Sequence, residues 1–331
     1  MKFKGYIMAA ILVLVLLLSG SIPTFAQSPE DYQMVLLLPG TIDDQSWNAT
    51  NYSGLVAANE ELGTNIEYVE NVQASDFEST MRNYAQRGYD LILAAGTQFD
   101  EAAQRVAQSY TDTTFTVVNG VIAQEPNLKP VMPKEYEASF LAGIIAGHVT
   151  ESNKLGLVGG FPNRQMIKLL NTYVWGARTV NEDIESTRSY ANSWSDVSLG
   201  NQMANSMIDD NADVLFFYAN EVGLGAIQAA DERGAKFIGF ASDQNDVAPG
   251  TVQASVYLNF EGLYVWIVEN FMSGELEPIV NEVGVNQGIV EVVYSDQISE
   301  QVKNDVEMAT EAIRNGDVLD YFSLSPEALD N

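Results

Sequence analysis

Residues 34–48, which read MVLLLPGTIDDQSWN, decide the fold. The apolar run Val35–Leu38 predicts a strand that is buried on both faces, as in a parallel sheet. The Pro-Gly pair after it ends the strand, and the polar residues that follow can cap a helix beginning near Trp47. A buried strand, a short polar loop and a helix start form the ligand-facing corner of an open α/β sheet. The stretch therefore predicts an α/β fold and one candidate binding corner.

Trp47 has two interpretations at this corner. Its indole either covers the helix against the sheet or offers an aromatic surface to a flat ligand. In the second case Asn48 and the acids Asp43 and Asp44 would add polar contacts.

Strands and helices alternate along the rest of the chain, which predicts parallel sheets with right-handed crossovers. The expected strands cover residues 66–69, 91–95, 114–118, 155–158, 187–191, 214–218, 237–240, 252–257 and 288–294. The expected helices cover residues 77–86, 101–109, 135–149, 165–179, 198–209, 223–232, 261–272 and 299–315.

A proline-rich stretch, residues 121–133, interrupts the alternation and suits a crossing between domains or a surface loop. The order of the last elements indicates that the chain returns to the first lobe and then to the second, which gives three crossing strands and a hinge. The predicted fold class is α/β, with two doubly wound parallel-sheet lobes joined by a three-strand hinge. The expected N-terminal lobe is residues 32–122 plus about 253–286, and the C-terminal lobe is residues 123–252 plus about 287–325.

Residues 1–26 are expected to form a secretory signal. Lys2 and Lys4 precede an apolar core at residues 7–18, which is too short to span a bilayer, and residues 24–26 fit a cleavage site. A Gly and a Pro after the core favour cleavage over a simple anchor. The mature protein is expected in the periplasm and, because the sequence has no Cys, is not expected to carry a lipid anchor.

The composition excludes several classes of partner and site. The formal net charge is −29, from 45 acidic and 16 basic residues, which disfavours nucleic acid and anionic lipid. The acids are scattered, as in a solvated surface. The absence of Cys also excludes disulfides and thiolate metal sites.

Other strand ends carry polar and aromatic residues that resemble the first corner. Thr97 and Phe99 follow one strand of the first lobe. In the second lobe the corresponding residues are Trp194, Asn220 and Asp243. Since the carboxyl ends of the strands in both lobes are expected to face a common cleft, these side chains are candidates for holding a planar polar ring.

Two of these candidates, and the rings Phe216 and Phe217 that precede Asn220, have plain structural alternatives. Asp243 can form a loop turn, and Trp194 can pack on the lobe surface. Phe216 and Phe217 are adjacent on a strand and point to opposite faces, so at most one of them can meet a ligand and the other belongs to the core.

The sequence offers no catalytic constellation. Its only histidine, His148, lies on a helix rich in Ala and Gly, where a capping or packing role is expected. No HExxH, GxSxG or P-loop pattern occurs. The protein is therefore not expected to be an enzyme or to need a cofactor.

Five phrases, in this order, resemble the BMP (basic membrane protein, or PnrA-like) family of substrate-binding proteins of ABC importers, over about residues 33–320. They are TIDDQSWN at 41–48, YEASFLAG at 136–143, KLGLVGG at 154–160, ADVLF at 212–216 and GLGAIQAA at 223–230. The resemblance implies a type I periplasmic binding protein that holds a solute between two lobes and delivers it to a membrane permease. We expect a monomer.

The resemblance also implies a purine nucleoside or nucleobase-like solute. Trp47 matches the aromatic residue that stacks on the base, and Phe216 or Phe217 falls where the other lobe supplies a second ring. Asp243 matches the acid that binds ribose hydroxyls.

Two departures from the nucleoside binders weaken the match to ribose. Leu38 stands where they carry an Asp, and Leu258 stands where they carry a Lys. The pattern around Leu258 looks closer to a branch suspected of taking smaller nucleobase-like solutes, with Tyr257, Asn259 and Trp194 replacing the missing contacts.

The predicted ligand-binding set is Asp44, Trp47, Asn48, Thr97, Phe99, Trp194, Phe217, Asn220, Asp243 and Asn259. A ligand-sensing receptor of the same fold and a binder of another small polar solute, such as a sugar, are the alternative functions.

Overall fold

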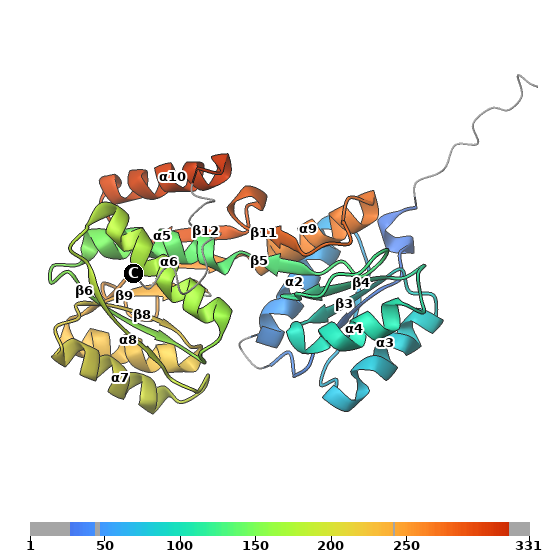
Figure 1. The fold of residues 1–331 in the computed structure, drawn as a ribbon, viewed down its shortest axis with the longest axis horizontal. Coiled ribbons are helices and arrows are strands. Elements are labelled where there is room, and N and C mark those ends of the chain that lie inside the picture. Colours follow the sequence, from blue (N-terminus) through green and yellow to red (C-terminus); the bar gives the residue numbers. More distant parts are fainter. Residues whose placement is uncertain (1–26, 44–46, 241, 318–331) are drawn as a thin grey trace, which may run out of the picture.

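The chain forms two α/β lobes that lie side by side (Figure 1). The computed structural model describes residues 27–43, 47–240 and 242–317. In this part of the chain each lobe is built on one six-stranded sheet, with the order β11-β5-β4-β3-β1-β2 in the first lobe and β12-β10-β9-β8-β6-β7 in the second. The expected secretory signal lies outside the described residues.

The first lobe is a parallel sheet covered on both faces. Its strands are β1 (Met34–Leu37), β2 (Glu67–Val69), β3 (Leu91–Ala95), β4 (Thr114–Val118), β5 (Val131–Pro133) and β11 (Asn281–Val283). Helices α2 (Trp47–Leu62) and α9 (Phe260–Ser273) pack on one face, and α3 (Phe77–Gln86) and α4 (Asp100–Ala107) pack on the other. Alternate residues of β1 enter the two cores, which explains its unbroken apolar sequence.

The second lobe repeats this plan with one antiparallel strand. Its strands are β6 (Lys154–Gly159), β7 (Glu185–Tyr190), β8 (Val214–Tyr218), β9 (Lys236–Phe240), β10 (Val252–Leu258) and β12 (Val290–Tyr294), and β12 is antiparallel to β10. Helices α5 (Glu135–Val149), α6 (Arg164–Val180) and α10 (Glu300–Asn315) cover one face. Helices α7 (Val197–Asp209) and α8 (Glu221–Arg233) cover the other.

Short 3-10 turns complete the description: η1 (Pro29–Asp31), η2 (Ala74–Asp76), η3 (Thr97–Phe99) and η4 (Val285–Gln287). No helix among the described residues is both long and apolar enough to cross a membrane.

Glycines bring the helices of the second lobe into close contact. A Cβ atom at Gly143 of α5 would lie 2.0 Å from the carbonyl oxygen of Tyr173 on α6, and one at Gly176 of α6 would lie 2.1 Å from that of Phe140 on α5. Small residues on α5 thus permit its close packing against α6. Helices α7 and α8 use Gly200 and Gly225 in the same reciprocal way.

Three segments cross between the lobes, as predicted: β5 to α5, β10 to α9, and β11 to η4. The predicted boundaries need correction, however. Strand β5 still belongs to the first sheet, so the first crossing lies at residues 133–135 rather than 122–123. Strand β10 belongs to the second sheet, so the second crossing lies at 258–260 rather than 252–253.

A buried carboxylate joins two of these crossings. Glu137 Oε2 accepts a hydrogen bond of 2.8 Å from the backbone N–H of Val285. Its Oε1 lies 3.3 Å from Lys134 Nζ. A Cβ atom at Gly284 would lie 2.1 Å from the same carboxylate, so a side chain there would displace it.

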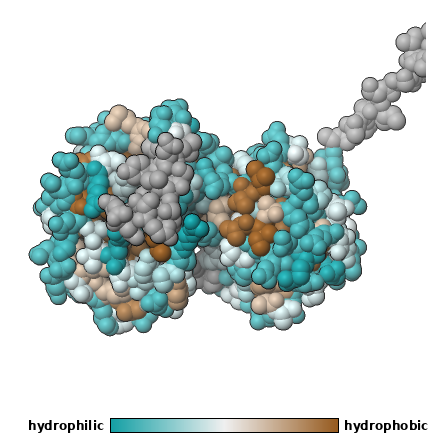
Figure 2. Space-filling model, in the orientation of Figure 1, coloured by the Kyte–Doolittle hydropathy of each residue, from teal (hydrophilic) through white to brown (hydrophobic). Residues whose placement is uncertain are grey.

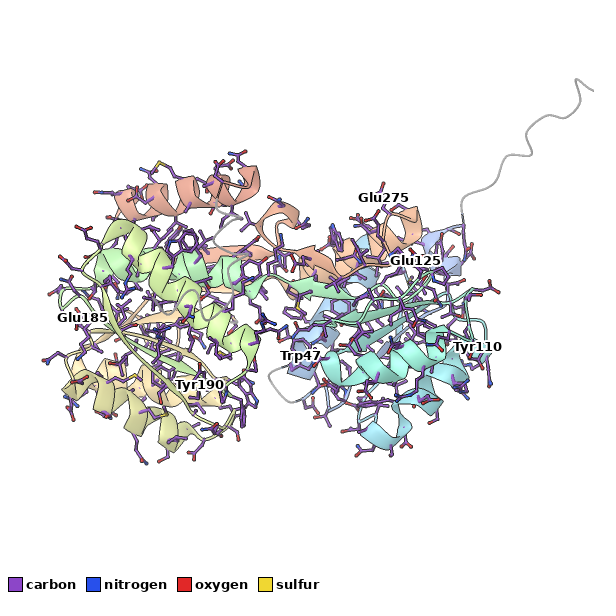
Figure 3. The ribbon with its side chains drawn as sticks, in the orientation of Figure 1. Trp47, Tyr110, Glu125, Glu185, Tyr190 and Glu275 are labelled. Atoms are coloured by element: carbon purple, nitrogen blue, oxygen red, sulfur yellow. The ribbon has the colours of Figure 1, made fainter. Side chains whose placement is uncertain are left out.

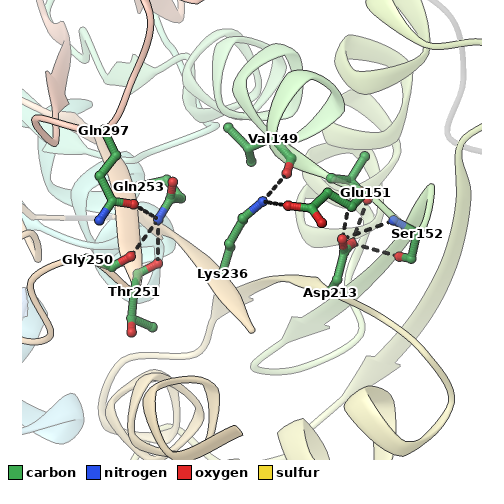
Figure 4. A network of polar contacts seen from close by, with 10 residues as sticks. Val149, Glu151, Ser152, Asp213, Lys236, Gly250, Thr251, Gln253 and Gln297 are labelled. Carbon is green, nitrogen blue, oxygen red and sulfur yellow. Dashed lines mark hydrogen bonds and ion pairs between the residues drawn. The ribbon is translucent and has the colours of Figure 1, made fainter. Parts of the chain in front are cut away.

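A polar network fixes the far end of α5 to the second sheet (Figure 4). Asp213 accepts hydrogen bonds from the hydroxyls of Thr150 and Ser152 and from the backbone N–H groups of Glu151 and Ser152. Lys236 Nζ donates to the carbonyl oxygen of Val149 at 2.7 Å and pairs with Glu151. The Lys236 contact satisfies one of the last carbonyls of α5, which have no partner within the helix.

Candidate functional site

Trp47 is the first residue of α2 and lies beside the crossing between the lobes. Its indole Nε1 donates a hydrogen bond of 3.2 Å to the carbonyl oxygen of Ala95, the last residue of β3. Its ring meets that of Phe260 edge to face, at 5.6 Å between centroids. Phe260 begins α9, directly after the second crossing. Figure 3 shows Trp47 on the side of the first lobe that faces the second. The residue is partly exposed: its indole covers the end of the sheet, and the interpretation as a surface for a flat ligand stays a prediction.

Asn48 shapes the loop rather than projecting from it. Its side chain is 8% exposed, and its Oδ1 accepts a hydrogen bond of 3.1 Å from the backbone N–H of Gly40. A Cβ atom at Gly40 would lie 2.6 Å from Asn48 Nδ2, so the Pro-Gly turn needs its glycine. Asp44 lies outside the described residues.

The prediction for Phe99 is wrong, and that for Thr97 stays open. Phe99 is 0% exposed and packs 3.8 Å, centroid to centroid, from Phe77 inside the core under α3 and α4. It therefore cannot touch a solute in this structure. Thr97 is exposed in η3, at the carboxyl end of β3.

The second lobe presents an aromatic pair at the carboxyl edge of its sheet. Trp194 is 39% exposed and packs over Gly160, where a Cβ atom would lie 2.2 Å from the indole. The Phe161 ring lies 5.6 Å from the Trp194 ring, between centroids, and is equally exposed. Tyr190, the last residue of β7, lies on the side of this lobe that faces Trp47 (Figure 3).

The prediction for Phe217 is also wrong. Phe216 is 0% exposed and stacks on Tyr173 under α5 and α6. Phe217 is 5% exposed and packs in the other core, beneath α7 and α8. Because helices cover both faces of the sheet, neither ring reaches the gap between the lobes.

The end of β8, just after Phe217, carries residues with polar groups. Asn220 is exposed before α8 and has φ 49°, a left-handed value that Asn tolerates better than most residues. Tyr218 ends β8, and its hydroxyl donates a hydrogen bond of 2.8 Å to Glu135 Oε1, at the start of α5. Burial raises the pKa of the Glu135 carboxyl, and the Tyr218 hydrogen bond opposes that shift. Burial and the nearby carboxyl both raise the pKa of Tyr218.

Asp243 is exposed and forms the loop turn that was the plain alternative. Its Oδ1 accepts hydrogen bonds from the backbone N–H of Asn245 at 3.0 Å and from Asn245 Nδ2 at 2.7 Å. It also lies close enough to Tyr257 for its charge to act on that phenol. The turn therefore holds the carboxylate next to the hinge.

Asn259 is part of a hydrogen-bonded group at the second crossing. Its Oδ1 accepts from the backbone N–H of Gly262 at 2.8 Å, which caps α9, and its Nδ2 donates to Glu291. Tyr257 donates to the same carboxylate at 2.6 Å. This hydrogen bond, followed by burial and the charges of nearby acids, raises the pKa of Tyr257 to about 12.

Contacts around this crossing connect Trp47 to Asp243. Trp47 touches Phe260, the next residue is Glu261, and the charges of Glu261 and Asp243 both act on Tyr257. Both residues therefore lie near the second crossing. The predicted site did not include four residues that the fold brings to this region: Glu135, Phe161, Tyr190 and Tyr218. For the three aromatic residues, the available sequence signal was a Tyr or Phe at the end of a strand.

No group of His, Asp or Glu among the described residues has the arrangement of a metal site. His148 has a packing role: its Nε2 lies 2.9 Å from Asp305 Oδ2 and joins α5 to α10.

The sequence model of the family described as "ABC transporter substrate-binding protein PnrA-like" (Bmp) matches residues 32–318. The chain belongs to this family. Bmp proteins are extracytoplasmic, non-enzymatic proteins that bind small solutes and deliver them to a membrane permease.

Individual relatives of this Bmp protein carry different names. It is 27% identical to the transcriptional activator protein Med of Bacillus subtilis over 258 residues, which cover 78% of this chain and 80% of Med. It is 30% identical to the nucleoside-binding protein BmpA of Lactococcus lactis over 193 residues, covering 57% and 55% of the two chains. A putative glucose-binding protein of Haloferax volcanii, TsgA13, is 28% identical over 284 residues, covering 85% and 72%.

Solved structures confirm the fold expected of a Bmp protein. The structure of a transcriptional activator of the comK gene from Bacillus halodurans superposes with a TM-score of 0.76 at 23% identity, covering 84% of this chain and 96% of that one. Solute-binding proteins of ABC transporters from Conexibacter woesei and Aeropyrum pernix each give a TM-score of 0.70. The predicted type I periplasmic binding fold is therefore confirmed.

Proposed function

We propose that this protein binds a flat polar solute, a purine nucleobase or a closely similar ring, between its two lobes and delivers it to an ABC permease. The observation that carries the proposal is the pair of partly exposed indoles, Trp47 and Trp194, at the carboxyl edges of the two sheets. Aromatic faces of this kind hold planar rings by stacking, and a few fixed polar groups then orient them.

Both indoles are held in place before any solute arrives. The Trp47 ring is oriented by its hydrogen bond to Ala95 and its contact with Phe260. The Trp194 ring rests on Gly160. Side chains that are already ordered lose little entropy on binding, which favours affinity.

Two buried leucines favour a base over a nucleoside. Leu38 and Leu258 are 0% and 6% exposed and belong to the hydrophobic core. At these positions the nucleoside binders carry an acid and a lysine, so the polar partners expected for a nucleoside are missing. Asn259 and Tyr257, which were expected to replace them, already bind Glu291.

The names of the relatives support two solute classes, a nucleoside for BmpA and glucose for TsgA13. A sugar is the second candidate, because aromatic rings also pack against the faces of sugars. The acid Asp243, exposed beside Tyr257, would serve either class by accepting hydrogen bonds from amino or hydroxyl groups.

Binding is coupled to closure of the lobes in this proposal. The three crossings form a hinge, and only the closed form offers the contacts of both lobes at once, so the solute shifts the population toward it. We place the mature protein in the periplasm. A receptor docking on a membrane sensor would need the same closure, but the family match favours transport.

Native mass spectrometry of the purified protein tests the proposal. The protein is isolated from its own cells without denaturation, and any bound small molecule is released and identified. A purine base or its close analogue is expected. A sugar as the bound solute would favour the second candidate and contradict the first.

A further inference from the structure

The hydrogen-bonded pair Glu135–Tyr218 lies where the hinge meets the second lobe. Glu135 opens α5, two residues after β5 ends, and β5 is part of the first sheet. Tyr218 ends β8, a central strand of the second sheet. The pair therefore lies at the base of the gap, next to the carboxyl edge that carries Trp194.

Backbone contacts tie this pair to the aromatic surface. The carbonyl oxygen of Tyr218 accepts a hydrogen bond of 2.9 Å from the N–H of Gly160, the residue on which the Trp194 ring rests. The Tyr218 ring meets Phe240 edge to face at 4.8 Å. Tyr218 is thus bonded both to Glu135 and to the residue on which the Trp194 ring rests.

One oxygen of the Glu135 carboxyl, Oε2, is available to a further partner. Oε1 accepts the hydrogen bond from Tyr218, and in the described part of the chain no hydrogen bond to Oε2 is present. Both residues are partly exposed rather than sealed in the core. Oε2 is not one of the sealed, unsatisfied side-chain atoms of the described residues, so water or a solute can reach it.

We propose that Glu135 forms a hydrogen bond with the polar edge of the solute and that its carboxyl does so as an uncharged acid. Tyr218 is its positioning residue. Oε1 accepts from Tyr218, and the Oε2 hydroxyl donates to an acceptor on the solute, such as a ring nitrogen or carbonyl of a nucleobase. This inference rests on the proposed function and adds the hydrogen-bond acceptor that the solute must present.

The electrostatic surroundings agree with an uncharged acid. Burial raises the pKa of Glu135, and Tyr218 is the one titratable group in the described residues that acts on it appreciably. No cation among these residues pairs with the carboxyl, so the Tyr218 hydrogen bond alone opposes the rise in its pKa. As pH rises through the elevated pKa, the hydroxyl loses its proton and can no longer donate.

Two substitutions of Glu135 separate this role from a charged contact. Glu135→Gln keeps the arrangement, because the amide oxygen accepts from Tyr218 and the amide nitrogen donates to the solute. Glu135→Ala removes both. Tyr218→Phe leaves the carboxyl in place but without its positioning hydrogen bond, and Glu300→Gln, at the exposed start of α10, is the matched control.

The test is calorimetric titration of each protein with adenine, guanine, hypoxanthine, xanthine and their ribonucleosides. For the purine that binds the parent, Glu135→Ala should lower affinity about tenfold, the loss of one buried hydrogen bond. The affinities of Glu135→Gln and Glu300→Gln should stay within about threefold of the parent's, and that of Tyr218→Phe should fall between those of the parent and Glu135→Ala.

Raising the pH should weaken purine binding by the parent but not by Glu135→Gln. Thermal unfolding confirms that each variant is folded, and if Glu135→Ala is not, Glu135→Gln and Tyr218→Phe carry the test.

Three outcomes would overturn the inference. Equal affinity of parent and Glu135→Ala removes Glu135 from the site and leaves the proposed function standing. A loss in Glu135→Gln as large as in Glu135→Ala shows a charged acceptor instead of a neutral donor. Binding of no purine by the parent contradicts the proposed function, and this inference falls with it.

Discussion

The indole Nε1 of Trp47 donates a hydrogen bond to the carbonyl oxygen of Ala95, across 3.2 Å. This contact attaches the start of α2 to the end of β3, so the aromatic ring at the first lobe's edge belongs to the sheet and not to a free loop. A ring held in this way keeps its orientation when the lobes close.

Replacing Trp47 should therefore reduce binding more than stability. Trp47→Ala should weaken binding of a stacked purine by about 1–3 kcal/mol, because one face of the ring loses its aromatic partner. Trp47→Phe should retain part of the affinity. Tyr68→Ala, which removes an exposed aromatic ring from edge strand β2, serves as the control and should bind like the parent. Calorimetry measures the difference, and unchanged affinity in Trp47→Ala would exclude this ring from the site.

The aromatic surface of the second lobe can be tested without replacing Trp194. In Gly160→Ala the new Cβ would lie 2.2 Å from the Trp194 ring, so the ring must move. We expect Gly160→Ala and Trp194→Ala to weaken binding by similar amounts, on the order of 1–3 kcal/mol. If Gly160→Ala binds normally while Trp194→Ala does not, the position of the ring is less critical than its presence.

The two misassigned phenylalanines give a contrasting prediction. Phe99→Ala and Phe217→Ala should each lower the free energy of unfolding by about 3–5 kcal/mol, since each leaves a cavity in a closed core. Urea denaturation measures this change. A variant that unfolds at the parent's midpoint but fails to bind would place that phenylalanine back in the site.

Asp213 should make the stability of the second lobe depend on pH. Burial alone would raise the pKa of its carboxyl, but hydrogen bonds from Thr150, Ser152 and two backbone N–H groups outweigh burial and hold the pKa below its usual value. A lowered pKa stabilises the fold above the unfolded-state pKa, and this contribution disappears as pH falls through the folded-state pKa.

The measurement for Asp213 is thermal unfolding from neutral pH into acid, for the parent and Asp213→Asn. The variant should be less stable at neutral pH, and the gap between the two should close as the medium becomes acidic. A gap that is constant with pH would show that the charge of Asp213 does not contribute.

Sequence periodicity predicted most of the architecture because doubly wound lobes repeat one pattern. The long helices and buried strands have strong signals, and α3, α5, β3, β4 and β8 begin and end where expected. Strands β5 and β11 were missed, since each has only three residues and β5 includes a proline. Missing them displaced the first crossing by about ten residues.

The site was harder to predict, for a physical reason that Phe217 illustrates. Alternation along a strand shows that adjacent side chains point to opposite faces, but in a doubly wound sheet both faces are core. Only residues at or beyond the strand end, such as Tyr218 and Trp194, can reach the gap. Glu135 and Tyr218 are 83 residues apart in the chain, and no local sequence pattern predicts a contact between them.

Calorimetric titration of the parent protein with adenine, guanine, hypoxanthine and xanthine, beside D-glucose, tests the central claim most directly. If the protein binds a flat ring between Trp47 and Trp194, at least one purine should bind saturably and glucose should not bind. Saturable binding of glucose with no response to any purine would contradict it.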